Sequence, residues 1–455
     1  MSESRLEQLV SQLKTGQIDR RTFTVRCAAA GISVLAAGSA LGSAAAQDSS
    51  PEASPVSAEL IPENLGVPGV AHNTDTSAGT VNLYSSWPMT AASEQIGGDS
   101  AAAVAFAIEV WGGAAGGFAI NYQPLDDGVA ATNGSWDATK EAENATLVIN
   151  DPDAPLYIGT YNSGAAEVSI PLTNEAGMAQ ISPANTAVRL TKENPSNPEG
   201  YPGVLYPTGV QTYFRVVPAD DLQGAAAANW AFNTKGATNA FILHDKQVYG
   251  EGVAAVFRDT FESLGGTISS FEGFNPDAEE YRSLVTKIAN SGADLVYLGA
   301  IVNLNASKLL LDLRDVVSAD EIAFLGPDGL NNQAFVDAAG DAAAGAYITF
   351  AGLPAPELTG VGKTWYDTFK ASLGHEPDGY AIYSFDVGVV ALQAIEQAGK
   401  DRAAVIANLA AVKGFRGLLG TWDFAETGDT TLTTVSLNQV VDGQITFQET
   451  IAPPA

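Results

Sequence analysis

Short apolar runs alternate with longer amphipathic stretches from Thr80 to the end of the chain. The clearest succession predicts a strand at residues 240–243, a helix at 250–264 and another strand at 295–298. A stretch with helical periodicity at residues 281–288 lies before the second strand. Strands that alternate with helices of this length are joined by right-handed crossovers, so we expect parallel sheets and an α/β fold.

One predicted helix carries a start signal. It runs from Asp220 to Asn233, with Asp220 as the candidate N-cap and Gln223 three residues later, as in a capping box. In a capping box the two side chains satisfy backbone N–H groups at the start of the helix. The sequence therefore assigns both side chains to the helix terminus.

The C-terminal end has a different pattern. Val435 and Leu437 alternate with polar residues, and residues 440–445 contain an Asp-Gly pair between two apolar runs. This pattern predicts two strands joined by a tight turn. A hairpin at the end of a long α/β chain indicates that the chain finishes by crossing back to an earlier lobe.

The first 46 residues are typical of an export signal. Arg20 and Arg21 precede an uncharged, Ala/Gly-rich stretch at residues 27–42, and the small-residue sequence SAAAQ predicts cleavage after Ala46. Residues 1–46 resemble a twin-arginine signal peptide, which directs folded proteins out of the cell. The alternative is a chance arginine pair at the start of an ordinary buried helix.

A segment rich in Ser, Pro, Ala and Glu follows at residues 47–78 and predicts a flexible linker. No later stretch reaches the roughly 18 consecutive apolar residues of a membrane span. We therefore expect an exported, soluble product on the periplasmic or extracellular side of the cell membrane.

The charge of the chain excludes two classes of partner. Its 455 residues include 22 Lys+Arg against 52 Asp+Glu, which gives a net charge of -30. Phosphates of nucleic acids and anionic membrane surfaces attract basic proteins and repel this one. The hydrophobic fraction of 46% is nevertheless high enough for a folded core. We interpret the acidity as a surface property that favours solubility.

The sequence predicts no metal site, catalytic residue or cofactor. The single cysteine, Cys27, cannot form an internal disulfide, and three scattered histidines do not form a zinc pattern. Gly250, Gly252 and Ala255 match a dinucleotide fingerprint in spacing, but six residues separate them from the preceding strand. That fingerprint requires the turn directly at the end of the strand.

Five segments in order resemble one family. They are GTYNSGAAEVSIPLTNEAGMAQISPANTAVRLT at 159–191, YFRVVPADDLQG at 213–224, ILHDKQVYGEG at 242–252, ADLVYLG at 293–299 and FLGPDGL at 324–330. Together they resemble the substrate-binding proteins of branched-chain amino acid ABC importers. The resemblance implies the periplasmic binding protein type I fold, with two Rossmann-like lobes that have parallel-sheet cores and are joined by three crossovers. Lobe 1 would comprise 79–212 plus 352–428, and lobe 2 would comprise 213–351 plus 429–455.

The resemblance also implies how an amino-acid carboxylate would be bound. Carboxylates favour hydroxyl groups and the free N–H groups of helix N-termini. Ser163 and Thr186 match the family's hydroxyl donors, and the backbone from Ala184 to Thr186 matches the rest of that site. The alternative for either hydroxyl is a helix cap with no ligand.

The same resemblance implies an ammonium site and an aromatic enclosure. Asp328 matches the family's acidic ammonium ligand, although it would be a turn aspartate on residue type alone. Tyr249 matches an aromatic residue of the second lobe that covers the ligand, and it could instead pack on the following helix. Tyr380 and Trp87 are weaker candidates that could be core residues, and Asn185 stands where some members have alanine.

The sequence therefore predicts a receptor without enzymatic activity. We expect the monomeric, exported substrate-binding component of an ABC importer, with a membrane permease as its partner and no nucleic acid. Its ligand would be a small amino acid of the branched-chain type, or a related amide, in the cleft between the lobes, where hinge closure follows binding. Two alternatives are a sensory binding module and an exported cofactor-dependent oxidoreductase. The sequence does not indicate a role for the Pro-rich segment at 192–209.

Overall fold

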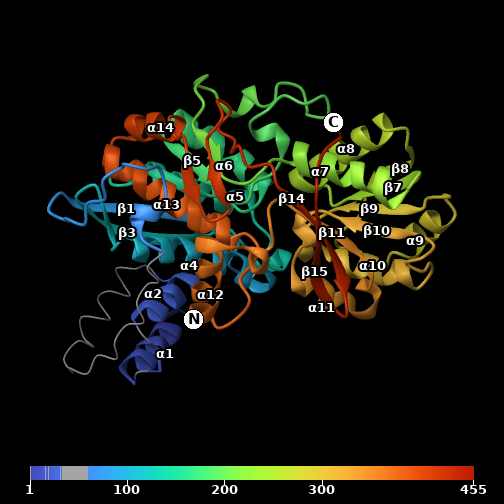
Figure 1. The fold of residues 1–455 in the computed structure, drawn as a ribbon, viewed down its shortest axis with the longest axis horizontal. Coiled ribbons are helices and arrows are strands. Elements are labelled where there is room, and N and C mark those ends of the chain that lie inside the picture. The colour runs from blue at the N-terminus through green and yellow to red at the C-terminus, as the bar shows by residue number, and fades with distance from the viewer. Residues whose placement is uncertain (1, 16, 19, 31, 33–59, 455) are drawn as a thin grey trace. The chain divides into compact units, whose positions relative to one another are not determined.

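The computed structural model describes residues 2–15, 17–18, 20–30, 32 and 60–454. These residues form two compact units (Figure 1). Unit 1 comprises Met1–Asn185, Gly203–Val217 and Ala355–Leu432, and unit 2 comprises Thr186–Pro202, Pro218–Pro354 and Thr433–Ala455. Each unit contains a mainly parallel sheet with helices, so the predicted α/β fold with two parallel-sheet cores is confirmed.

The sheet of unit 1 has six strands in the order β2-β3-β1-β4-β5-β6. All neighbouring strands are parallel except β2 and β3. The strands are β1 (Gly79–Trp87), β2 (Ala114–Ala115), β3 (Phe118–Asp126), β4 (Leu156–Gly159), β5 (Ala179–Ser182) and β6 (Tyr213–Arg215). A separate antiparallel pair consists of β12 (Phe415–Gly417) and β13 (Gly420–Trp422).

Eight α-helices of unit 1 lie among the described residues. They are α1 (Ser2–Lys14), α2 (Arg20–Ala29), α4 (Glu94–Val110), α5 (Ala138–Ile149), α6 (Ser163–Glu175), α12 (Gly360–Leu373), α13 (Ala381–Ala398) and α14 (Arg402–Ala410). Helices α4 and α13 contact each other, and most residues of both are buried. A helix that is apolar around its whole circumference belongs in a core, and the burial of these two helices agrees with that.

The sheet of unit 2 has seven strands in the order β15-β14-β11-β10-β9-β7-β8. They are β7 (Asn239–His244), β8 (Thr267–Gly273), β9 (Leu295–Gly299), β10 (Ala323–Gly326), β11 (Tyr347–Phe350), β14 (Val435–Val441) and β15 (Gln444–Ile451). Its α-helices are α7 (Asp220–Asn229), α8 (Val248–Ser263), α9 (Arg282–Ala289), α10 (Ser307–Arg314) and α11 (Gln333–Ala339). Successive residues of β7 belong to different core clusters, because a parallel sheet is covered on both faces.

The predicted C-terminal hairpin is confirmed. Strands β14 and β15 are antiparallel, and β14 pairs with β11 at the edge of the unit 2 sheet. Asp442 and Gly443 have positive φ values of 50° and 74°. Two successive residues with positive φ are the geometry of the tight hairpin turn that an Asp-Gly pair favours.

The capping prediction for α7 is wrong. Asp220 is the first residue of the helix and Ala219 is the N-cap, without a side-chain capping bond. The N–H of Asp220 instead donates to the carbonyl oxygen of Thr186 at 2.8 Å. The α-helix ends at Asn229, and the chain continues as a π-helical turn over Trp230–Lys235.

Two segments differ from the predicted organisation. Residues 60–78, predicted as part of a flexible linker, pack on unit 1, since Leu60 and Leu65 are buried and Gly66 forms a β-bridge with Arg416. Residues 47–59 lie outside the described part of the chain. The segment 186–202, predicted in lobe 1, clusters with unit 2. There Lys192 pairs with Asp221 at 2.9 Å.

The predicted export signal is described only in part. Helices α1 and α2 are present, whereas the Ala/Gly-rich stretch and the cleavage site after Ala46 lie outside the described residues. The side chains of the arginine pair lie outside them as well. Within the described chain, the helices are too short or too polar to cross a membrane. The signal therefore remains a prediction.

Candidate ligand-binding site

Unit 2 brings together two of the predicted ligand-binding residues. Asp328 follows β10 and begins a short 3-10 helix, Asp328–Leu330, while Tyr249 lies in the first turn of α8. The hydroxyl of Tyr249 donates to Oδ1 of Asp328 at 2.5 Å and accepts the N–H of Gly329 at 2.9 Å. Tyr249 is thus held by polar contacts with the Asp328 turn and does not merely pack on its own helix.

Gln223 joins this pair to the start of α7. Its Nε2 donates to Oδ1 of Asp328 and, at 3.2 Å, to Oδ1 of Asp220. Its Oε1 accepts the N–H of Asp328 at 3.2 Å and the hydroxyl of Thr349 at 3.1 Å. The sequence singled out Gln223 as a capping residue, but the structure makes it the residue that orients the Asp328 carboxylate.

Asp328 is a buried anion with hydrogen-bond donors. The residue is 6% exposed, and among the described residues its carboxylate forms no ion pair with Lys, Arg or His. Burial raises the pKa of Asp328 to about 6, while the bonds from Tyr249 and Gln223 act in the opposite direction. The carboxylate is therefore mainly ionised at neutral pH, in surroundings where an unpaired charge is unfavourable.

Two buried hydroxyl groups lie close to this network. The Thr186 Oγ1 has no hydrogen-bond partner in the described chain, although the residue is 1% exposed. Its carbonyl accepts the N–H of Asp220, so hydrogen bonds connect Thr186 through Asp220 and Gln223 to Asp328. The Tyr297 hydroxyl is also buried without a partner in that part of the chain, and its pKa is raised by burial and, to a lesser extent, by the charges of Asp220 and Asp328. Sequence reasoning missed Tyr297 because it lies inside an apolar strand.

The predicted carboxylate-binding residues of unit 1 lie at the carboxyl ends of its strands. Ser163 is the first residue of α6 and is 2% exposed. The N–H groups of Ala184 and Asn185 donate to Oγ of Ser182 at 3.1 and 3.0 Å. The Asn185 side chain accepts the Tyr213 hydroxyl at 3.0 Å and donates to the Tyr161 carbonyl at 2.9 Å. Asn185 therefore fixes the loop after β5.

The two weaker aromatic candidates are both buried. Tyr380 precedes α13, is 4% exposed, and packs edge-on against Tyr161 with ring centroids 5.4 Å apart. Trp87 is the last residue of β1 and is fully buried. Both environments fit the alternative interpretation as core residues, and a ligand role for either remains a prediction.

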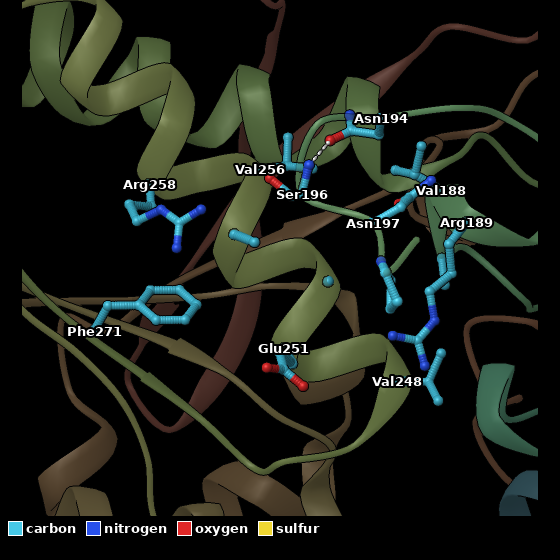
Figure 2. Close-up of a pocket in the computed structure, with 14 residues that line it drawn as sticks. Val188, Arg189, Asn194, Ser196, Asn197, Val248, Glu251, Val256, Arg258 and Phe271 are labelled. Atoms are coloured by element: carbon cyan, nitrogen blue, oxygen red, sulfur yellow. Dashed lines mark hydrogen bonds between the residues drawn. The ribbon is translucent and has the colours of Figure 1, made fainter. Parts of the chain in front are cut away.

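Figure 2 shows a separate cavity of unit 2, between residues 187–198 and helix α8. Its volume is about 150 Å³, and none of the predicted ligand-binding residues lines it. The Arg258 guanidinium lies 4.6 Å from the centre of the Phe271 ring and pairs with Asp259 at 2.7 Å. This cavity results from the packing of the first part of the Pro-rich segment on α8. No three Asp, Glu, His or Cys side chains in the described chain gather as a metal site.

Comparisons with solved structures agree with this architecture. The chain is similar to a leucine-binding protein LivK from Thermotoga maritima, with a TM-score of 0.71, 23% identity, and coverage of 82% of this chain and 99% of that one. It is similar to the substrate-binding protein LivJ from Streptococcus pneumoniae in complex with isoleucine, with a TM-score of 0.70, 21% identity and coverage of 82% and 100%. A solute-binding protein of R. palustris in complex with benzoate has a TM-score of 0.69, 21% identity and coverage of 83% and 98%. These similarities show the fold.

Sequence comparisons identify the family. The leucine-, isoleucine-, valine-, threonine- and alanine-binding protein of Pseudomonas aeruginosa is 27% identical over 356 residues, which cover 78% of this chain and 88% of that protein. A Leu/Ile/Val-binding protein homolog of Brucella abortus is 28% identical over 273 residues, covering 60% and 68%. The sequence pattern of the periplasmic binding proteins matches residues 85–444. With the two parallel-sheet units, this match over most of the chain places the protein in the periplasmic binding protein family.

Proposed function

We propose that the chain is the exported substrate-binding component of an ABC importer and binds a small amino acid, of the branched-chain type, or a related amide. The family binds substrates and does not transform them, so this protein is not an enzyme. The observation that carries the choice of ligand is the buried Asp328 carboxylate, which lacks a cationic partner in the described chain. An ammonium group supplies that partner.

In this proposal Asp328 binds the ligand's ammonium group. The side-chain hydrogen bonds from Gln223 and Tyr249 both go to Oδ1, and in this proposal the ammonium group binds Oδ2. Tyr249 and Gln223 fix the carboxylate before the ligand arrives, which lowers the entropy cost of binding. A charge-assisted hydrogen bond of this kind contributes about 1.5 to 3 kcal/mol.

Thr186 is the proposed donor to the ligand's carboxylate. Its buried hydroxyl has no partner in the described part of unit 2, and a buried hydroxyl without a partner is unfavourable. A ligand carboxylate accepts that hydrogen bond. Ser163, Ala184, Asn185, Tyr380 and Trp87 of unit 1 stay predictions that rest on the family resemblance.

The charge of Asp328 favours amino acids over aryl carboxylates. Some solved relatives of this fold contain benzoate or 4-hydroxybenzoate, whereas others contain leucine or isoleucine. A benzoate ion has no cationic group for Asp328 and adds a second negative charge near it, which is repulsive in a buried site. The names of the curated relatives also favour leucine, isoleucine and valine. A membrane permease is the partner that this function requires.

A titration-calorimetry screen of the purified protein tests the proposal. The probes are L-leucine, L-isoleucine, L-valine, L-alanine, their amides, urea and benzoate. We expect saturable binding of at least one amino acid or amide and weaker or no binding of benzoate. Binding of benzoate in preference to every amino acid, or no binding of any amino acid or amide, would overturn the assignment.

A further inference from the structure

The amino-terminal helices pack on unit 1 with a specific apolar face. Helix α2 contacts α4 and α12, and α1 contacts α2 (Figure 1). In α2, Phe23 and Val25 are fully buried and Cys27 is 1% exposed. Leu9 of α1 joins Phe23 and Cys27 in one hydrophobic cluster. The segment therefore buries the side chains that directly follow the arginine pair.

A glycine of α4 makes room for this contact. A Cβ atom at Gly98 would lie 2.8 Å from the carbonyl oxygen of Ala29, and the other atoms near it also belong to Ala29. At the neighbouring Gly97, by contrast, a Cβ atom would lie 2.2 Å from the Pro88 carbonyl oxygen, within the body of unit 1. A larger residue at Gly98 would thus disturb the amino-terminal segment and leave the rest of α4 in place.

Polar contacts complement the apolar face. Nε of Arg26 donates to the Ser372 carbonyl at 3.3 Å, near the carboxyl end of α12. A cation at the carboxyl end of a helix interacts favourably with the helix dipole. Arg5 of α1 pairs with Glu94 of α4 at 2.7 Å, but both side chains are exposed and such pairs contribute little. The Arg26 contact therefore adds specificity to the docked position.

We infer that helices α1 and α2 dock, through α2, on the face formed by α4 and the end of α12, and that this docking competes with recognition of the segment by an export receptor. Helix α2, which carries the buried Phe23, Val25 and Cys27, cannot pack on α4 and contact a receptor or a bilayer at the same time. The competition rests on the predicted export signal, whereas the docking rests on the observed contacts. Since α4 and α12 form one face only in folded unit 1, folding controls when the segment is covered.

The single cysteine gives a direct readout of docking. Burial raises the pKa of the Cys27 thiol to about 12, which adds to its protection from thiol reagents. In the uncleaved native chain we expect Cys27 to react at least about tenfold more slowly than in the denatured chain. The Gly98→Val variant should lose most of that protection. Gly252→Val is the matched control, because a Cβ atom at Gly252 meets no atom within 4 Å.

A second variant keeps the test valid if Gly98→Val does not fold. Arg26→Gln changes the segment alone and should also increase the rate of Cys27 labelling. Circular dichroism and amino-acid binding establish that each variant is folded. Docking would be overturned if Cys27 of the native chain were labelled rapidly. It would also be overturned if neither variant increased the rate of Cys27 labelling.

Export in cells tests the competition. The Gly98→Val precursor should be processed faster than the native precursor, and the Gly252→Val precursor at the native rate. Equal or slower processing of Gly98→Val would overturn the competition. Absence of processing in all three chains would overturn the export signal on which it rests. Amino-acid binding by the purified protein is measured separately, so failure of the proposed transport function is distinguishable from either result.

Discussion

Two buried aspartates, one in each unit, show how hydrogen-bond donors decide the charge of a carboxyl group. Asp328 of unit 2 and Asp127 of unit 1 both follow the carboxyl end of a parallel strand and are at most 6% exposed. Asp328 accepts bonds from Tyr249 and Gln223, whereas neither oxygen of Asp127 has a partner among the described residues. Burial raises the pKa of Asp328 to about 6 and that of Asp127 well above its ordinary value.

The surroundings of Asp127 strengthen the contrast. Burial and the nearby charges of Glu141 and Asp126 raise the pKa of Asp127, while Lys140 opposes them weakly. Glu141 itself accepts bonds from Ser86 at 2.6 Å and from Tyr157 at 2.9 Å. Burial still raises the pKa of Glu141 to about 7. Unit 1 therefore holds two neighbouring buried acids whose pKa values are raised, whereas unit 2 holds a single carboxylate that accepts bonds from Tyr249 and Gln223.

Removal of the Gln223 amide should destabilise the hydrogen-bond network around Asp328 in unit 2. In Gln223→Leu, Asp328 loses a donor and an acceptor, and Thr349 loses its partner. Each unsatisfied buried group costs about 1 to 3 kcal/mol, so we expect a loss of about 3 kcal/mol in the free energy of unfolding. Urea denaturation measures it, with the exposed Gln448→Leu as the control. A loss no larger than that of the control would contradict the role of Gln223.

A rise in pH from about 5 to neutral should weaken unit 1. An acid whose pKa is raised by folding stabilises the folded state at low pH, and this contribution is lost as the pH rises through the folded-state pKa. For Glu141 that value is about 7, and for Asp127 the shift has the same direction. Between the unfolded-state and folded-state pKa values of each group, we expect the free energy of unfolding to fall by about 1.4 kcal/mol per pH unit. Urea denaturation from pH 5 to 8 measures this, and stability that rises over the range would contradict it.

The smallest expected loss of stability is that of Asp127→Asn, which we compare with Asp126→Asn. Asp127→Asn replaces a buried carboxyl group, whose pKa is raised and whose oxygens have no partner in the described chain, by an amide of the same shape. We therefore expect a loss below about 1 kcal/mol at pH 7 and a weaker pH dependence. Asp126 accepts the N–H groups of Met89 and Gly128, both at 2.8 Å, and the Thr90 hydroxyl. Asp126→Asn should therefore cost more. Equal losses in thermal denaturation of the two variants would contradict this difference.

Much of this architecture could be predicted from the chain alone. The period of apolar residues predicted a parallel sheet, the family resemblance implied two such lobes, and the Asp-Gly pair predicted the terminal hairpin. Motif order singled out Tyr249 and Asp328, which hydrogen-bond each other in unit 2. These features depend on short local patterns of the sequence or on residue types that few other residues can replace at that position.

Contacts between distant residues could not be predicted in the same way. Gln223 and Asp328 are 105 positions apart, and a glutamine amide bonds many partners equally well. The segment at 60–78 lacks periodicity, yet it is held by Gln393 and Arg416 more than three hundred positions away. The local amino-acid composition of a segment does not indicate which distant residues it contacts.

The most direct test of the central claim is the dissociation constant of L-leucine for the Asp328→Asn variant, measured by titration calorimetry at pH 7. The amide keeps the shape of the side chain and removes the charge that the ammonium group requires. We predict a roughly 10- to 100-fold weaker affinity than that of the native protein, which corresponds to the loss of a charge-assisted bond. The exposed Asp337→Asn variant should bind as the native protein does. An unchanged affinity in Asp328→Asn would contradict the ammonium site.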